Sequence, residues 1–175
     1  FPTRRSSDLS APRCFEIESR LRRSLDIPVF HDDQHGTAIV VLAALLNSVK
    51  LVDKRAEGLR VVMAGAGAAG TAIVDLLQAT GIRDIVVWQR GGCLVQGDHS
   101  LAANKRVLAE RTNPRGITGD LETALTGADV FIGVSGPGVL NPAWITRMGR
   151  DPIVFALANP DPEVDPMEAA EHAAI

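Results

Sequence analysis

The sequence predicts an α/β fold in which a parallel β-sheet is covered by helices on both faces, and three observations predict it. Short, continuously apolar segments alternate with segments of helical character, the pattern of parallel strands that are buried on both faces. A glycine-rich turn at residues 65–70 lies between one such strand and the helix after it. The length of 175 residues suits one domain with a substantial core. Together these observations predict a Rossmann-type, doubly wound sheet.

The predicted elements follow in order along the chain. Apolar residues at helical spacing from Cys14 to Leu25 predict an amphipathic helix, and Pro28 favours an extended segment after it. Residues 36–50 are almost wholly apolar, which predicts a helix buried on all sides. The predicted strands are residues 60–64, 85–88, 130–134 and 153–157. The predicted helices are residues 69–80, 104–111, 121–125 and 142–148, with another starting near residue 168; residues 91–100 are predicted to be a loop.

Composition and charge exclude several classes of protein. The chain has 46% hydrophobic and 22% charged residues and a net charge of -3. This balance is typical of a globular domain and gives no basic surface for nucleic acid or an anionic membrane. The longest apolar run, residues 38–46, is far shorter than the roughly 20 residues that cross a bilayer. Cys14 and Cys93 form no disulfide framework, so we expect a reducing, cytoplasmic location.

The two ends of the chain have an unusual sequence. Residues 1–9 contain neither an initiator Met nor the apolar core of a signal peptide. They resemble the in-frame translation of a sequencing adapter, so we interpret them as a non-native leader before a domain at residues 10–175. No stop signal ends the last predicted helix, and we expect the chain to be cut at both ends.

The clearest motif is the glycine-rich turn, which has the pattern G-x-G-x-x-G. Because it closes a strand and opens a helix, it predicts a dinucleotide site. The first glycine permits the tight turn, the second lets the backbone approach a pyrophosphate, and the third lets helix and strand pack closely. The helix N-terminus offers N–H groups to the phosphates. The predicted binding residues are Gly65, Gly67, Ala68, Ala69 and Gly70; the alternative is a turn without a ligand.

The end of the second predicted strand bears on the choice of cofactor. An acidic residue there would bind the ribose 2′-OH of NAD, whereas Arg accompanies the 2′-phosphate of NADP. This chain has Gln89 and Arg90 and no carboxylate at that point. The sequence therefore favours NADP over NAD, with a solvated loop arginine as the alternative.

A second constellation is the run His31-Asp32-Asp33-Gln34-His35. Adjacent carboxylates before a buried helix suit a hard cation such as Mg²⁺ or Mn²⁺, which takes oxygen ligands. Two alternatives remain open. His31 and His35 could form half of a zinc site, although the H-E-x-x-H pattern needs Glu where Asp32 stands. Asp33 could also simply cap the helix.

Two further loops follow predicted strands. Ser135 and Gly136 come after the third strand, and Asn159 comes after the fourth. Ligands of open α/β sheets bind outside the carboxyl ends of the strands. We therefore expect these loops to meet at one site, although each by itself could be only a turn.

Several of these stretches together resemble bacterial malic enzymes. They are residues 10–18, 27–37, 65–70, 128–135 and 155–163, and the match extends from about Ser10 to the last residue. The resemblance implies the NAD(P)-binding domain of a larger enzyme. It also implies oxidative decarboxylation of malate to pyruvate and CO₂ with NAD(P)⁺ and Mg²⁺ or Mn²⁺, by a homo-oligomer.

The resemblance implies roles for individual residues. Asp33 matches a metal ligand, and Asp32 lies beside it in the same catalytic site. Asn159 matches an asparagine that holds substrate near the nicotinamide. The residues matching positions that approach the dinucleotide are Thr37, the glycine-rich turn, Ser135 and Gly136.

The sequence also departs from the family pattern. The family's adjacent Glu-Asp metal ligands fall on Ser7 and Asp8; Asp8 has the right identity, but Ser7 cannot replace a Glu ligand. The catalytic Tyr and Lys belong to a preceding domain. The chain contains no Tyr, and its lysines, Lys50, Lys54 and Lys105, match no catalytic position. We therefore expect the chain to be inactive alone, because the proton donor is missing.

Three other functions remain possible on sequence grounds. Another Rossmann-type oxidoreductase, such as an amino-acid dehydrogenase, would bind NAD(P) without a metal. A non-catalytic dinucleotide-binding module would bind the nucleotide but not respond to malate and Mn²⁺. A zinc hydrolase that uses the two histidines would ignore nucleotides.

Overall fold

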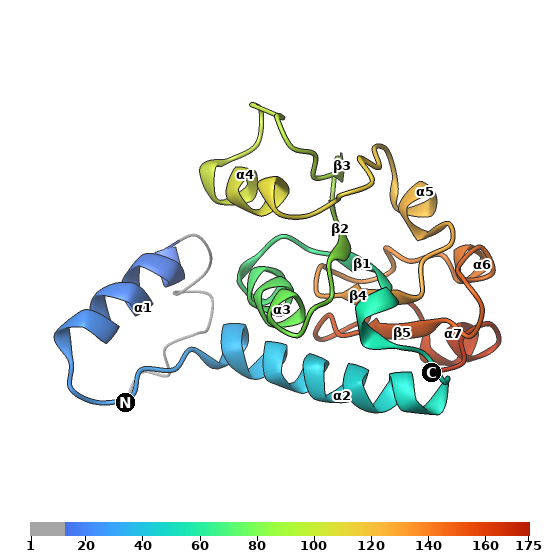
Figure 1. Cartoon of the computed structure of the whole chain (residues 1–175), viewed down its shortest axis with the longest axis horizontal. Coiled ribbons are helices and arrows are strands. Elements are labelled where there is room, and N and C mark those ends of the chain that lie inside the picture. The colour runs from blue at the N-terminus through green and yellow to red at the C-terminus, as the bar shows by residue number, and fades with distance from the viewer. Residues whose placement is uncertain (1–12) are drawn as a thin grey trace.

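The computed structural model describes residues 13–175, and its centre is a five-stranded sheet in the order β3-β2-β1-β4-β5 (Figure 1). The strands are β1 (Arg60–Ala64), β2 (Asp84–Gln89), β3 (Gly92–Cys93), β4 (Val130–Gly133) and β5 (Ile153–Ala156). β1 pairs in parallel with both β2 and β4, and β4 pairs in parallel with β5. The predicted parallel sheet is confirmed.

One strand differs from the prediction. β3 lies inside the segment predicted to be a loop and pairs antiparallel with β2 through Trp88 and Cys93 and through Gln89 and Gly92. This strand has only two residues, one of them a glycine with positive φ, so it is too short to show the alternation of apolar and polar side chains that predicts a strand. Such a short edge strand forms because β2 supplies the partner, so tertiary pairing decides it.

The helices correspond to the predicted ones, and all except α5 have shifted ends. They are α1 (Arg13–Ser24), α2 (Thr37–Leu51), α3 (Ala68–Ala79), α4 (Ala103–Glu110), α5 (Leu121–Leu125), α6 (Pro142–Ile145) and α7 (Pro166–Ala170), with a π-helical turn η2 (Asp32–Gly36) and a 3₁₀ turn η3 (Ala56–Gly58). α6 ends three residues earlier than predicted. α7 begins earlier than predicted because the Asp165 side chain accepts hydrogen bonds from the first free N–H groups.

The sheet separates two apolar cores. Alternate residues of β1 point to opposite faces, so Val61 and Met63 join one core and Val62 and Ala64 join the other. The first core includes apolar side chains of α2, α3 and α4, and the second those of α5, α6 and α7. Helices therefore cover both faces of the sheet, as a doubly wound fold requires (Figure 1).

α2 is not buried on all sides, so that prediction is wrong. Val41 and Leu45 face the core, whereas Val40 and Leu51 are 66% and 76% exposed. The helix lies along one side of the domain, and its inner face packs against α3 and joins the first apolar core (Figure 1). The outer face of α2 is exposed because no other element of residues 13–175 covers it.

The segment Asp32–Leu51 also bears on the membrane expectation. It is a continuous helical segment of 20 residues, near the N-terminus, that is long and apolar enough to cross a bilayer. This is weak evidence, since helices of globular cores meet the same criterion. Its buried residues, among them Ala38, Val41 and Leu45, belong to the first apolar core.

Candidate functional site

The glycine-rich turn joins β1 to α3, and its glycines meet three different requirements. Gly65 has φ +123°, and a Cβ there would lie 2.7 Å from the carbonyl oxygen of Val134. A Cβ on Gly70 would overlap the carbonyl oxygen of Gly65, whereas a Cβ on Gly67 would meet no atom. The first and third glycines are therefore required by packing, and the second faces open space.

This open space belongs to a cleft of about 580 Å³ at the carboxyl ends of β1, β2 and β4. The cleft is lined by Gly65, Ala66, Gly67, Gln89, Arg90, Ala102, Asn104, Lys105, Val134 and Ser135. Four predicted cofactor residues therefore meet there: Gly65, Gly67, Arg90 and Ser135. Ala68, Ala69 and Gly70 begin α3 behind the turn, and Gly136 does not line the cleft.

The cleft favours a negatively charged ligand. Gly67, which lines the cleft, directly precedes α3, and no side chain caps this end, so the first N–H groups of the helix are free for a ligand. Two cationic side chains, Arg90 and Lys105, line the cleft, and none of its lining residues is acidic. This combination suits phosphate groups.

Sequence reasoning missed one wall of this cleft. Ala102, Asn104 and Lys105 come from the start of α4. Only their place at the start of a helix after a strand could have indicated this role, because such a helix begins near the carboxyl edge of a doubly wound sheet. The sequence predicts this helix from residue 104, one residue after its observed start, but no pattern in the sequence shows that its first turn lines the cleft.

A second cleft has a volume of about 310 Å³. It is lined by Asp32, Gly36, Thr37, Val40, Val41 and Leu157. The Asp32 carboxylate lies against Gly36, where a Cβ would overlap it. Thr37, predicted to approach the dinucleotide, lines this cleft instead of the first one. Asn159 is exposed two residues after Leu157.

Asp33, the predicted metal ligand, is exposed on the same turn as Asp32. Within residues 13–175 no three His, Cys, Asp or Glu side chains come together as a metal site. The described donors are thus one or two carboxylates, which suits a hard cation that keeps waters and substrate as its other ligands. Asp8 and residues 1–9 lie outside the described residues, so the predictions about them stay predictions.

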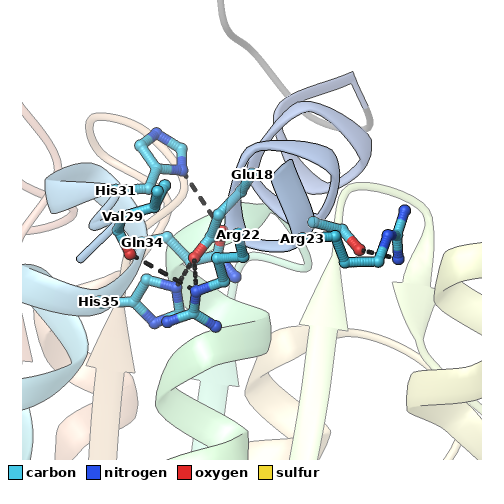
Figure 2. Close-up of polar contacts among 8 residues, drawn as sticks. Glu18, Arg22, Arg23, Val29, His31, Gln34 and His35 are labelled. Atoms are coloured by element: carbon cyan, nitrogen blue, oxygen red, sulfur yellow. Dashed lines mark hydrogen bonds and ion pairs between the residues drawn. The ribbon is translucent and has the colours of Figure 1, made fainter. Parts of the chain in front are cut away.

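Polar contacts hold the turn η2 in place (Figure 2). His35 Nε2 lies 2.7 Å from Glu18 Oε1, and His31 Nδ1 lies 3.3 Å from Gln34 Oε1. Arg22 Nε lies 3.4 Å from the same Glu18 oxygen. Both histidine rings therefore have partners of their own, which does not favour the alternative that they bind zinc together.

Comparison with known proteins identifies the family. A family model described as malic enzyme, NAD binding domain, matches residues 34–174. The chain belongs to the malic enzyme family. The predicted family is confirmed. The match explains the Rossmann-type sheet, so the alternative of another oxidoreductase class, such as an amino-acid dehydrogenase, is not needed.

The relatives of this malic enzyme chain use both cofactors. It is 54% identical over 164 residues to an NAD-dependent malic enzyme of Geobacillus stearothermophilus, which covers 94% of this chain and 34% of the relative. It is 46% identical to an NADP-dependent malic enzyme of Halomonas elongata, covering 94% and 38%. The crystal structure of an NAD-dependent malic enzyme from Thermotoga maritima superposes with a TM-score of 0.92 at 50% identity, covering 95% and 45%. The chain thus spans between about one third and one half of these malic enzymes.

Proposed function

We propose that this malic enzyme chain is the dinucleotide-binding part of an enzyme that converts malate to pyruvate and CO₂ while reducing NAD(P)⁺. One observation carries the proposal: residues that line the first cleft and the carboxylate-bearing second cleft follow two neighbouring strands, β4 and β5, at the carboxyl edge of the sheet. β4 ends at the first cleft and β5 at the second, and Leu157 N donates to Gly133 O over 2.9 Å between them. A cofactor in one cleft would therefore lie beside a substrate in the other.

The residues divide the chemistry between the two clefts. The glycine-rich turn and the N-terminus of α3 would bind the pyrophosphate, with the nicotinamide toward Ser135. Asn159 would hold malate by its hydroxyl or carboxylate so that C2 faces the nicotinamide. Transfer of hydride from C2 to NAD(P)⁺, with loss of the C2 hydroxyl proton to a general base, gives oxaloacetate, and loss of CO₂ from oxaloacetate gives the enolate of pyruvate.

A divalent metal is part of the proposal, with Asp33 as a ligand and Asp32 beside it. The oxygen donors suit Mg²⁺ or Mn²⁺. Bound there, the ion would supply stabilisation of the negative charge that develops on the C2 oxygen. Asp8 remains a candidate second ligand.

We further propose that NADP is the preferred cofactor. The second strand ends without a carboxylate, and both Arg90 and Lys105 line the cleft beside it. Two cations at this position fit a 2′-phosphate better than a free 2′-OH. The family contains both NAD-dependent and NADP-dependent enzymes, so it is compatible with a preference for either cofactor.

Calorimetric titration of the chain with NADP⁺ and NAD⁺, each with and without Mn²⁺ and malate, tests the proposal. We expect both nucleotides to bind, NADP⁺ more tightly, with a further change on adding Mn²⁺ and malate together. Failure of both nucleotides to bind would contradict the proposed function. Binding without any effect of Mn²⁺ and malate would favour the non-catalytic module.

The chain alone is expected to give no malate-dependent NADPH formation. It contains no tyrosine, and Lys54 is paired with Asp129 over 2.8 Å, away from the cofactor cleft. The chain therefore lacks the tyrosine that the family resemblance implies as proton donor, and it has no lysine at the catalytic position implied for the proton acceptor. Clear turnover would contradict this reasoning.

Two expectations about the whole enzyme remain proposals. Two free cysteines support a reducing, cytoplasmic location. We also propose that the complete enzyme is a homo-oligomer, which sedimentation of the full-length protein would measure.

A further inference from the structure

Glu163 is a fully buried carboxylate that has no part in the chemistry described so far. Its exposed fraction is 0%, and no described Lys or Arg forms an ion pair with it. A buried charge is costly unless hydrogen bonds satisfy it. The groups that donate to it therefore indicate what the carboxylate does.

The donors come from two different loops. Glu163 Oε1 accepts from the backbone N–H of Ser135 at 2.7 Å and from its hydroxyl at 3.2 Å. Glu163 Oε2 accepts from the backbone N–H of Ala158 at 3.0 Å. Ser135 follows β4, and Ala158 follows β5. A single carboxylate thus joins the loop at the cofactor cleft to the loop that carries Asn159.

The position of this carboxylate is itself fixed. Leu140 N donates to the carbonyl oxygen of Glu163 at 3.0 Å, and Gly138 N donates to that of Pro162 at 3.2 Å. On the other side, a Cβ on Gly133 would lie 2.6 Å from Glu163 Oε2. Only glycine at residue 133 leaves room for the carboxylate, so the two loops are held at one separation.

Ser135 and Arg90 line the same dinucleotide cleft from β4 and β2 respectively. The ribose of the adenosine half lies at the end of β2 in this fold, so the nicotinamide half extends toward Ser135. We propose that Glu163 is a positioning residue that fixes the Ser135 loop against the Asn159 loop. Nicotinamide and substrate then meet at a set distance. This inference rests on the proposed function.

The test uses the substitution Glu163→Gln in the 175-residue chain. The amide has one acceptor oxygen and a donating NH₂ group, so it can hold one loop but not both. Wild type and variant are titrated calorimetrically with NADP⁺ and with 2′,5′-ADP, which carries only the adenosine half; for a chain that prefers NAD⁺, the pair is NAD⁺ and ADP. We expect the dinucleotide to bind about tenfold more weakly and the adenosine half to bind within about twofold of wild type.

Two variants act as controls. Glu168→Gln changes an exposed carboxylate five residues further along the chain and is expected to change neither affinity. Glu163→Asp keeps the charge but is one methylene too short to reach both loops. It should show the same selective loss, and it provides the measurement if the Gln variant does not fold.

Three outcomes would count against the inference. Equal weakening of both ligands would show that Glu163 only stabilises the fold. Unchanged dinucleotide affinity in both variants would show that the loops keep their positions without it. A wild-type chain that binds neither ligand would contradict the proposed function itself, before any variant is compared.

Discussion

His35 Nε2 lies 2.7 Å from Glu18 Oε1, and this contact joins α1 to the turn that carries Asp32 and Asp33. The Glu18 side chain is only 9% exposed, so the contact is largely screened from solvent. Glu18 is 17 residues from His35 in sequence, and Figure 2 shows the two side chains meeting between the helix and the turn. The orientation of the predicted metal-binding carboxylates therefore depends on a helix outside the sheet.

We predict that Glu18→Ala destabilises the chain by about 1–3 kcal/mol, because it leaves the partly buried His35 ring without its partner. Mn²⁺ should bind more weakly, since the turn loses its contact with α1. Thermal unfolding and Mn²⁺ titration measure the two effects. Glu16→Ala is the control, because Glu16 is 76% exposed and pairs with Arg20 only at 3.8 Å. Equal melting temperatures for the two variants would contradict the prediction.

The glycine-rich turn allows stability and binding to be separated. Gly70→Ala should cost about 1–3 kcal/mol of stability, because the new Cβ overlaps the Gly65 carbonyl. Gly67→Ala should leave stability nearly unchanged, since no atom lies within 4 Å of its Cβ. The methyl group would instead occupy the space proposed for the pyrophosphate. NADP⁺ affinity should then fall at least about tenfold, roughly 1.4 kcal/mol.

Calorimetry and thermal melts of both glycine variants check this contrast. If the Gly67→Ala chain bound NADP⁺ as tightly as wild type, the pyrophosphate could not bind at this turn.

Cofactor preference should depend on two cations that line the first cleft, Arg90 directly after β2 and Lys105 on α4. Arg90→Ala and Lys105→Ala should each weaken NADP⁺ binding about tenfold, the effect of losing one charge-assisted hydrogen bond of roughly 1.5 kcal/mol. NAD⁺ affinity should change little, because NAD⁺ has no 2′-phosphate. Arg83→Ala, at an exposed position that does not line the cleft, is the control. Equal losses for both cofactors would assign the two side chains to the pyrophosphate instead.

Cys93 is predicted to be an unreactive thiol. Burial, and then the negative charge of Asp120, raise the pKa of Cys93 from its ordinary value of 9.0 to about 11. Alkylation by iodoacetamide at pH 8 should therefore be slower in the folded than in the urea-unfolded chain by more than about a hundredfold. The measurement uses a Cys14→Ala background, in which Cys93 is the remaining thiol.

The same shift makes stability depend on pH. Because the folded pKa of Cys93 lies above the unfolded value, the contribution of this thiol to stability is complete below about pH 9. It is lost as the pH rises from about 9 to about 11. Cys93→Ala should flatten this part of the curve, and an unchanged slope would contradict the assignment.

Most of the fold could be predicted from local patterns. The runs at Arg60–Ala64 and Leu121–Leu125 form the expected strand and helix with the expected bounds. Continuous apolar character signals a strand buried on both faces, and the glycine-rich turn fixes where strand gives way to helix. The two-residue strand β3 and the exposed outer face of α2 could not be predicted, because pairing partners and covering elements lie far away in sequence.

The candidate site was predictable only in part. The glycine-rich turn, Arg90 and Ser135 meet in one cleft as expected, since strand ends gather at one edge of a parallel sheet. Lys105 matches no catalytic position in the sequence, and only the structure shows that it lines the first cleft. Thr37 lines the second cleft and not the first, so its approach to the dinucleotide stays a prediction.

The sequence by itself determined the family and the order of the helices and the four longer strands, and it led to the chemistry that we propose at the carboxyl edge. It did so because the glycine-rich turn, the adjacent carboxylates and the apolar periodicity are patterns of residues that lie close together in the sequence. Only the tertiary structure decided which side chains share a cleft, and that Glu163 joins the Ser135 and Ala158 loops. A buried carboxylate has no sequence period, and its role depends on donors that folding brings to it.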